Sequence, residues 1–263
     1  MTEPRLAHSL MFIDLLRSEY CKLRSVRSTF WTLLAGVVSN IGLAALLAIV
    51  LPGRISARDL ATVDPVQVSL GGIHLSQIAF AVLGVLVISS EYGTGMIRAS
   101  LTAVPQRRFM LAAKVTVYAA TGLAIGVMSS FAAYVVFQTF LTGDTLRSSL
   151  SDPGVLRAVI GGGLFLSVLG LLGLGLGATI RSSAGAIATV FGLLFVPSFL
   201  VHLLPQSWSS TISPYIPMEA GDQIYLAHQA QGSLGPWTGF SVFCLYAAAA
   251  LGAGFILIAH RDA

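Results

Sequence analysis

Charged side chains are scarce in this sequence of 263 residues, in which Asp, Glu, Lys and Arg together make up 10%. A soluble domain carries about 25% of these residues, so the composition excludes a protein whose whole surface faces water. Disorder is excluded as well, because segments that stay unfolded combine low hydrophobicity with high net charge, whereas 55% of this chain is hydrophobic. The scarcity of charge therefore predicts a polytopic membrane protein.

Cysteine is equally scarce, and the common catalytic motifs are missing. Cys21 and Cys244 stand near opposite ends of the sequence, which argues against a disulfide framework. The five histidines form no H-E-x-x-H pair, and no G-x-S-x-G turn presents a nucleophilic serine. An intramembrane enzyme is therefore the least favoured function, and we expect this chain to bind no metal or cofactor of its own.

A phosphate-binding loop is also missing. Lys22 and Lys114 follow no G-x-x-x-x-G-K-[ST] turn, and Arg98 stands where a dinucleotide finger starting at Gly93 needs its third glycine. None of the 11 acidic residues falls near the middle of a long apolar stretch, so a proton or sodium relay is poorly supported. If the chain transports a solute, we expect a separate subunit to hydrolyse ATP.

What the sequence does contain is six apolar stretches long enough to cross a bilayer. A hydrocarbon core of about 30 Å needs roughly 20 residues of helix at 1.5 Å per residue. The stretches cover residues 30–51, 73–90, 109–141, 155–180, 184–204 and 237–259. We therefore expect an all-α, six-span domain over residues 30–263, preceded by an N-terminal segment over residues 1–29.

The Lys and Arg residues are distributed unequally between the two sides of these spans. With both termini inside, only Arg54, Arg58, Arg147 and Arg157 lie on the outer side, and the other cations lie on or near the inner side. Cytoplasmic loops carry the excess of Lys and Arg, so both termini are predicted to be cytoplasmic.

The N-terminal segment repeats apolar residues at helical spacing, with cations between them. The apolar residues are Leu6, Leu10, Ile13, Leu16, Tyr20 and Leu23. Such a helix lies in the membrane interface, with its apolar face in lipid and its cations near the phosphate groups. We expect an interfacial amphipathic helix here rather than an ordinary cytoplasmic stub.

Uncharged polar residues and glycines interrupt the spans. The polar residues are Asn40, His74, Gln77, Gln138 and His202. Each is able to form a hydrogen bond between helices, and together they are also candidates for polar points along a substrate route. Gly173 and Gly177 have the G-x-x-x-G spacing of close helix packing, either between the fourth and fifth spans or between subunits.

The segment after the second span is the most informative. Residues 89–98 read S-S-E-Y-G-T-G-M-I-R, residues 101–108 read L-T-A-V-P-Q-R-R, and residues 112–114 read A-A-K. This series closely resembles the E-x-x-x-G-T/M-I-R … T-x-P-x-R-R … A-K pattern of ABC-2-type transporter permeases, especially those of actinobacteria. Residues 18–31, S-E-Y-C-K-L-R-S-V-R-S-T-F-W, are similar to the segment that leads into the first span in that family.

The resemblance implies a permease subunit in a bacterial plasma membrane. The subunit would pair with a second permease copy or a paralogue and dock cytoplasmic ATP-binding cassette (ABC) ATPases, which bind the ATP and Mg²⁺. The loop after the second span would be a coupling helix seated in an ATPase cleft. Its candidate residues are Glu91, Tyr92, Met96, Ile97, Arg98, Leu101, Pro105, Arg107 and Arg108.

The chemistry of this loop suits that role. A short helix with apolar anchors and a basic rim fits a protein groove, although Arg107 and Arg108 serve equally well as topology determinants beside anionic lipid. Glu91 lies at the membrane boundary, where an unpaired carboxylate is costly, so we expect an arginine partner for it. The family also folds the outer connection before the last span into short re-entrant helices, and residues 205–236, punctuated by proline and glycine, are long enough for this.

The leading hypothesis is therefore a permease subunit of an ATP-driven exporter. Its substrate would pass between two copies of the first, second and fifth spans, and lipid-like, drug-like or peptide cargo is favoured because the spans lack fixed charges. The alternative is a non-transporting membrane scaffold, immunity or sensor protein that acts by stoichiometric binding. Membrane lipids are expected partners, and nucleic acid is not.

Overall fold

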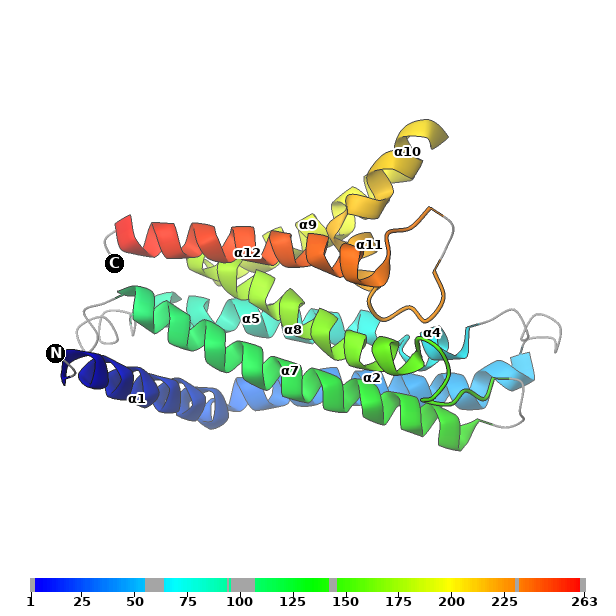
Figure 1. Cartoon of the computed structure of the whole chain (residues 1–263), viewed down its shortest axis with the longest axis horizontal. Helices are drawn as coiled ribbons and strands as arrows, with labels where there is room; N and C mark the ends of the chain where they lie inside the picture. The colour runs from blue at the N-terminus through cyan, green and yellow to red at the C-terminus, as the bar shows by residue number, and fades with distance from the viewer. Residues whose placement is uncertain are drawn as a thin grey trace.

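The computed structural model describes residues 3–54, 64–93, 95, 107–141, 146–229 and 232–260, with side chains for all of these except 3–11 and 107. Long helices aligned along one axis form a bundle, and the described residues include no strand (Figure 1). Six of the helices are long and apolar enough to cross a membrane: α2 (Arg27–Arg54), α5 (Ile73–Gly93), α7 (Arg107–Phe140), α8 (Val155–Ile180), α9 (Ser183–Val201) and α12 (Pro236–His260). The predicted all-α, multi-pass membrane protein is confirmed, and each span lies within a few residues of its expected bounds.

Shorter elements flank these spans. The N-terminal helix α1 (Glu3–Ser25) is separated from α2 by a break at Val26, and α4 (Pro65–Ser69) precedes α5. The connection between α9 and α12 holds α10 (Gln206–Ile212), the 3₁₀ turn η1 (Ser213–Tyr215) and α11 (Pro217–Asp222). The predicted division of this connection into short pieces is therefore observed, and α10 projects away from the bundle in Figure 1.

Two ends of the bundle are distinguished below. The terminal end holds the starts of α1 and α7 and the ends of α5 and α12, so the chain begins and finishes on the same side (Figure 1). The opposite end holds α4, α11 and the start of α8. Helix α1 runs along the long axis of the molecule, parallel to the spans, and packs on α7. A helix in the plane of the membrane interface would instead cross the spans, so the orientation of α1 does not agree with the predicted interfacial helix.

Helix α8 occupies the centre and packs against α5, α7, α9 and α12. Glycine makes these contacts possible. A Cβ atom on Gly173 would lie 2.5 Å from the Ala81 carbonyl oxygen, and one on Gly177 would lie 2.9 Å from Ile88 Cγ2. The G-x-x-x-G pair therefore packs inside the chain against α5, the second span, rather than against the fifth span or another subunit.

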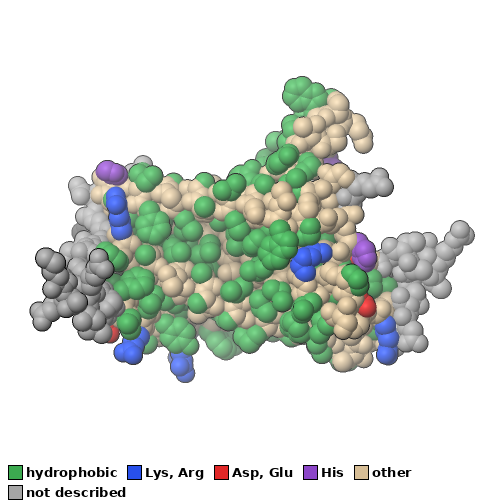
Figure 2. Space-filling view, viewed as in Figure 1, with side chains coloured by type: hydrophobic (Ala, Val, Ile, Leu, Met, Phe, Trp, Pro, Cys, Tyr) green, Lys and Arg blue, Asp and Glu red, His purple; other side chains and the backbone are tan. Residues whose placement is uncertain are grey.

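The surface of the bundle is apolar where a membrane would surround it. Figure 2 shows hydrophobic side chains over the middle of one face, with the few charged side chains toward the two ends. Large exposed apolar residues include Trp31, Phe199 and Leu245, each more than 60% exposed. A water-facing surface of this kind would aggregate, so the distribution agrees with a membrane location.

Candidate functional site

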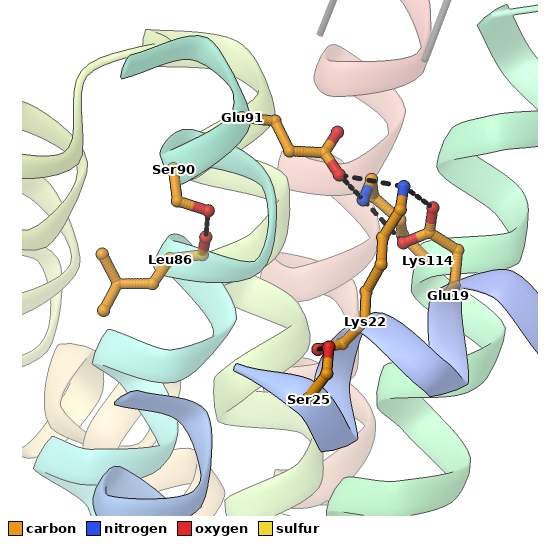
Figure 3. Close-up of polar contacts among 7 residues, drawn as sticks. All are labelled: Glu19, Lys22, Ser25, Leu86, Ser90, Glu91 and Lys114. Carbon is orange, nitrogen blue, oxygen red and sulfur yellow. Dashed lines mark hydrogen bonds and ion pairs between the residues drawn. The ribbon is translucent and has the colours of Figure 1, made fainter. Parts of the chain in front are cut away.

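A buried cluster of four charged side chains lies at the terminal end (Figure 3). Lys114 is at its centre, with its side chain 1% exposed, and its Nζ donates to Glu91 Oε1 at 2.6 Å and to Glu19 Oε2 at 2.7 Å. Lys22 Nζ donates to Glu19 Oε1 at 2.7 Å and to Glu91 Oε1 at 3.3 Å. Two carboxylates and two ammonium groups thus balance one another.

This ion cluster joins three helices. Glu19 and Lys22 come from α1, Glu91 from the last turns of α5 and Lys114 from the first turns of α7. Burial alone is costly for a charge, so each of these groups depends on its partners. For Lys22, burial lowers the pKa, but the hydrogen bond and charge of Glu19 and the charge of Glu91 outweigh burial, and the net shift is upward from 10.5. The cluster fastens α1 to the bundle.

The expected arginine partner of Glu91 is wrong, because its partners are Lys114 and Lys22. Lysine fits here because its flexible stem and compact ammonium group reach two carboxylates that approach from different helices. The sequence did contain a sign of this partner: Lys114, in the A-K that ends the motif after the second span, is a lone lysine inside an apolar run. Glu19 and Lys22 stand in the N-terminal segment that resembles the family, but they were not named as site residues because their pairing with α5 and α7 leaves no local sign in the sequence.

A second set of contacts joins the end of α5 to the turn between α8 and α9. The Arg181 guanidinium carbon lies 5.1 Å from the centre of the Tyr92 ring, a cation–π distance. The hydroxyls of Ser89 and Ser183 are 2.8 Å apart. Arg181 ends α8 with φ of 60°, a left-handed conformation that is uncommon for a residue other than glycine. The end of α5 is thus held by α1 and α7 through the ion cluster and by α8 and α9 through this turn.

Most of the predicted coupling residues lie outside the described residues, namely Met96, Ile97, Arg98, Leu101 and Pro105. Of the others, Glu91 and Tyr92 take part in the contacts above, Arg107 begins α7, and Arg108 is exposed beside it. The coupling helix itself therefore stays a prediction, while the two residues that precede it are fixed to the bundle.

Three of the predicted polar residues make hydrogen-bond contacts of different kinds. Asn40, fully buried in α2, donates to Ser129 Oγ of α7 at 3.0 Å. Gln138 Nε2 donates to Ser148 Oγ at 2.8 Å and so holds the segment that leads into α8. His202 is exposed, and its Nδ1 lies 2.6 Å from the Ser198 carbonyl oxygen one turn earlier. The predicted hydrogen bond between helices is therefore observed for Asn40, whereas Gln138 bonds a connecting segment and His202 contacts its own helix.

The other two polar residues lie toward the opposite end. The exposed His74 ring approaches Tyr225 edge-on at 6.4 Å between centres, and Gln77 is buried one turn further along α5. Gln77 Oε1 has no hydrogen-bond partner among the described residues. Asn40 lies beside Gly72, near the start of α5, whereas Gln138 and His202 make their contacts elsewhere. The five residues are therefore not all brought together at one site.

Arg157 organises the opposite end. Its guanidinium donates to the carbonyl oxygens of Gln223, Ile224, Leu226 and Ala227, at 3.0–3.4 Å. The chain that follows α11 is thereby held against the start of α8. Asp64 adds a second attachment, because one of its carboxylate oxygens caps α4 and the other lies 3.0 Å from His228 Nδ1.

A buried carboxyl group accompanies this attachment. Burial raises the pKa of Asp222 to about 7, with the nearby Tyr225 hydroxyl opposing the shift and the charge of Glu219 adding to it. Burial also raises the pKa of Tyr225 well above 10.0. Neither Asp222 Oδ1 nor the Tyr225 hydroxyl has a hydrogen-bond partner of good geometry within the described part of the chain. No cation neutralises Asp222 there, in contrast to the ion cluster.

Comparisons with known proteins add no family. No protein-family model matches the chain, and no curated protein matches it. Across the described residues, no three His, Cys, Asp or Glu side chains gather in a way that would hold a metal ion. The class of protein that the fold defines is a multi-pass, all-α membrane protein with its main polar cluster at the terminal end.

Proposed function

We propose that this chain is the permease subunit of an ATP-driven exporter and that a separate cytoplasmic ABC ATPase supplies the energy. The observation that best supports the proposal is which residues form the ion cluster. Glu19 and Lys22 belong to the N-terminal segment that resembles ABC-2-type permeases, whereas Glu91 and Lys114 belong to the segment after the second span. The two segments that resemble the family therefore meet in one ion cluster, which is called the joint below, although up to 95 positions separate their residues in the sequence.

The joint suits the transmission of movement. Residues 94–106 connect α5 to α7 in the sequence. Glu91 of the cluster and Tyr92 of the Tyr92–Arg181 contact lie shortly before this segment, and Lys114 of the cluster lies in the first turns of α7 after it. An ATPase that shifts this segment would move the ends of α1, α5, α7 and α8 together. ATP binding would then favour one arrangement of the spans over another, provided that the ATPase binds the two arrangements with different affinity.

A second copy of the chain completes the pathway in this proposal. In α2 and α9 only 22% of the most apolar stretch is buried within one copy, less than in the other spans. Both helices pack on α5, and their open faces carry Phe30, Trp31, Phe195 and Phe199. Two copies that meet through α2, α5 and α9 would cover these side chains and enclose an apolar route for lipid-like, drug-like or peptide cargo.

The outer lid of the route would come from α10 and α11. Trp208 and Ile212, the two large apolar residues of the otherwise polar α10, are exposed within one copy, whereas large apolar side chains are usually buried. A partner copy would cover them, as backbone at membrane depth requires. The cytoplasmic position of the terminal end and the bacterial plasma membrane belong to the same proposal.

The decisive experiment reverses charge at the predicted coupling segment. The full chain is expressed with a candidate ABC ATPase taken from a neighbouring gene. Arg98→Glu with Arg107→Glu should abolish both co-purification of that ATPase and substrate-stimulated ATP hydrolysis. Arg54→Glu, at the opposite end, is the matched control and should leave both unchanged. Full assembly and hydrolysis in the double variant, or hydrolysis by the isolated chain, would contradict the proposal. A scaffold or sensor protein would bring no ATPase in any of these preparations.

A further inference from the structure

An apolar groove lies between α1, α2 and α7. It adjoins the ion cluster along α1, and Phe30 of α2 belongs both to its lining and to the open face of α2 described above. Its volume is about 730 Å³, within the roughly 300–1,000 Å³ range of ligand sites. Carbon atoms form nearly all of its wall, which includes Leu16, Leu23, Leu33, Ala120, Ala124 and Ile125. Ala120 and Ala124 are exposed, so the groove opens onto the outer surface of α7, where a span meets lipid.

Two arginines stand on the α1 wall of this groove. Arg17 and Arg24 both line it, and both are exposed. They are seven positions apart, about two helical turns, and therefore lie on the same side of α1. Lys22 of the same helix is neutralised by Glu19 and Glu91, whereas Arg17 and Arg24 form no ion pair within the described part of the chain. The groove thus combines an apolar wall with two uncompensated positive charges.

We propose that this groove binds one anionic phospholipid, with an acyl chain along the apolar wall and the phosphate between Arg17 and Arg24. The wall offers few hydrogen-bonding groups, so it suits a hydrocarbon chain and not a polar solute. Guanidinium groups bind phosphate through charge-assisted, often bidentate hydrogen bonds. Juxtamembrane cations favour anionic over neutral lipid. The bound lipid would hold α1 against α2 and α7 beside the ion cluster, because Leu16 and Leu23 lie on the same helix as Glu19 and Lys22.

The test measures lipid binding directly and does not depend on transport. The full chain in detergent is titrated with phosphatidylglycerol and with phosphatidylcholine of the same acyl chains, and bound lipid is counted by native mass spectrometry. We expect phosphatidylglycerol to bind at least about tenfold more tightly. Arg17→Gln with Arg24→Gln should remove this preference, while Arg54→Gln, at the opposite end, should retain it.

A second pair of variants tests the groove itself. Ala120→Phe with Ala124→Phe fills the open wall with side chains that face away from the core, and should abolish tight phosphatidylglycerol binding without lowering the melting temperature. Ala248→Phe with Ala249→Phe makes the same change on exposed positions of α12 and should have no effect. Equal binding of the two lipids to the unmodified chain, or unaltered binding after the groove is filled, would overturn the proposal. A change of oligomeric state on filling would also overturn it, because the groove would then belong to a contact between copies.

Discussion

The two ends of the bundle treat buried charge in opposite ways. At the terminal end, Glu91 and Lys114 lie 2.6 Å apart inside a group that carries no net charge. At the opposite end, Arg157 is directed at backbone carbonyl oxygens and leaves the buried Asp222 carboxyl without a cation. Among the described residues, the ion cluster at the terminal end thus meets the cost of burying ions by pairing them, whereas Asp222 is buried without a paired cation.

This difference predicts different mechanical roles for the two ends. The ion cluster links three helices to one another, whereas Arg157 only holds the chain after α11 against α8. Ions that hold one another across three helices resist separation, so α1, α5 and α7 are expected to move as one body. A carboxyl group that remains protonated near neutrality adds no such constraint, and the carbonyl oxygens bound by Arg157 belong to one short stretch of chain. Four substitutions test this contrast, and they follow in order of expected effect.

Replacing Lys114, at the centre of the ion cluster, should cause the largest loss of stability. Lys114→Gln leaves Glu19 and Glu91 facing each other in a buried site with only the half-exposed Lys22 between them. We expect a loss of about 3–5 kcal/mol in the free energy of unfolding, measured by denaturant titration in detergent. Glu91→Gln combined with Lys114→Gln should cost less than the sum of the single changes. Strict additivity would show that the two residues do not interact.

Replacing Arg157, which donates hydrogen bonds at the opposite end, should lower the free energy of unfolding by a smaller amount. Arg157→Lys replaces a planar fork that reaches several carbonyl oxygens with a single ammonium group, so we expect a loss of about 2 kcal/mol. Because the loss is local, amide hydrogen exchange should accelerate in residues 223–229 and not at the terminal end. Arg108→Lys, an exposed change at the other end, is the control. Faster exchange throughout the bundle would mean that Arg157 also stabilises the joint.

The carboxyl of Asp222 should make stability depend on pH. An unfolded Asp loses its proton near pH 4, whereas in the folded chain Asp222 keeps its proton up to about pH 7. The folded state binds more protons in this window, so stability should fall as the pH rises from about 4 to about 7. Melting temperatures of the unmodified chain and of Asp222→Asn should therefore converge at low pH and separate near neutrality. Parallel pH profiles would rule out a raised pKa.

Replacing Lys22, the most exposed residue of the ion cluster, should cause the smallest loss of stability. Lys22 is 35% exposed in its side chain, and Lys114 continues to bridge Glu19 and Glu91 when Lys22 is changed. Lys22→Gln should therefore lower stability by about 1 kcal/mol or less, with a reduced effect at high salt because exposed charges are screened. A loss as large as that of Lys114→Gln would place the centre of the cluster at Lys22.

The spans were predictable because each depends on a local property of the sequence. Length and apolar composition located all six, and α8 begins at Val155 and ends at Ile180 as expected, bounded by residues with positive φ at Gly154 and Arg181. The spacing of Gly173 and Gly177 likewise predicted a close helix contact. It did not identify α5 as the partner, since spacing describes one helix and not its neighbour.

The candidate site was predictable only in part. The motif identified Glu91 and Tyr92 as important, but the pairing of Glu91 with Lys114 and Glu19 depends on how α1 and α5 pack on α7. Charge alone pointed to an arginine, because several arginines lie on the predicted inner side. The burial of Asp222 was equally hidden, since its segment is rich in turn-forming residues and gives no sign of the packing around α11.

The most direct measurement is the composition of the complex released from native membranes. The chain, with a mass of 27.6 kDa, is extracted without dissociating its neighbours and weighed by native mass spectrometry. The account predicts an assembly of two permease subunits, identical or paralogous, with two ABC ATPase subunits, and predicts that Arg98→Glu with Arg107→Glu releases the ATPases. A chain that emerges from its own membrane with no ATPase attached would contradict the account.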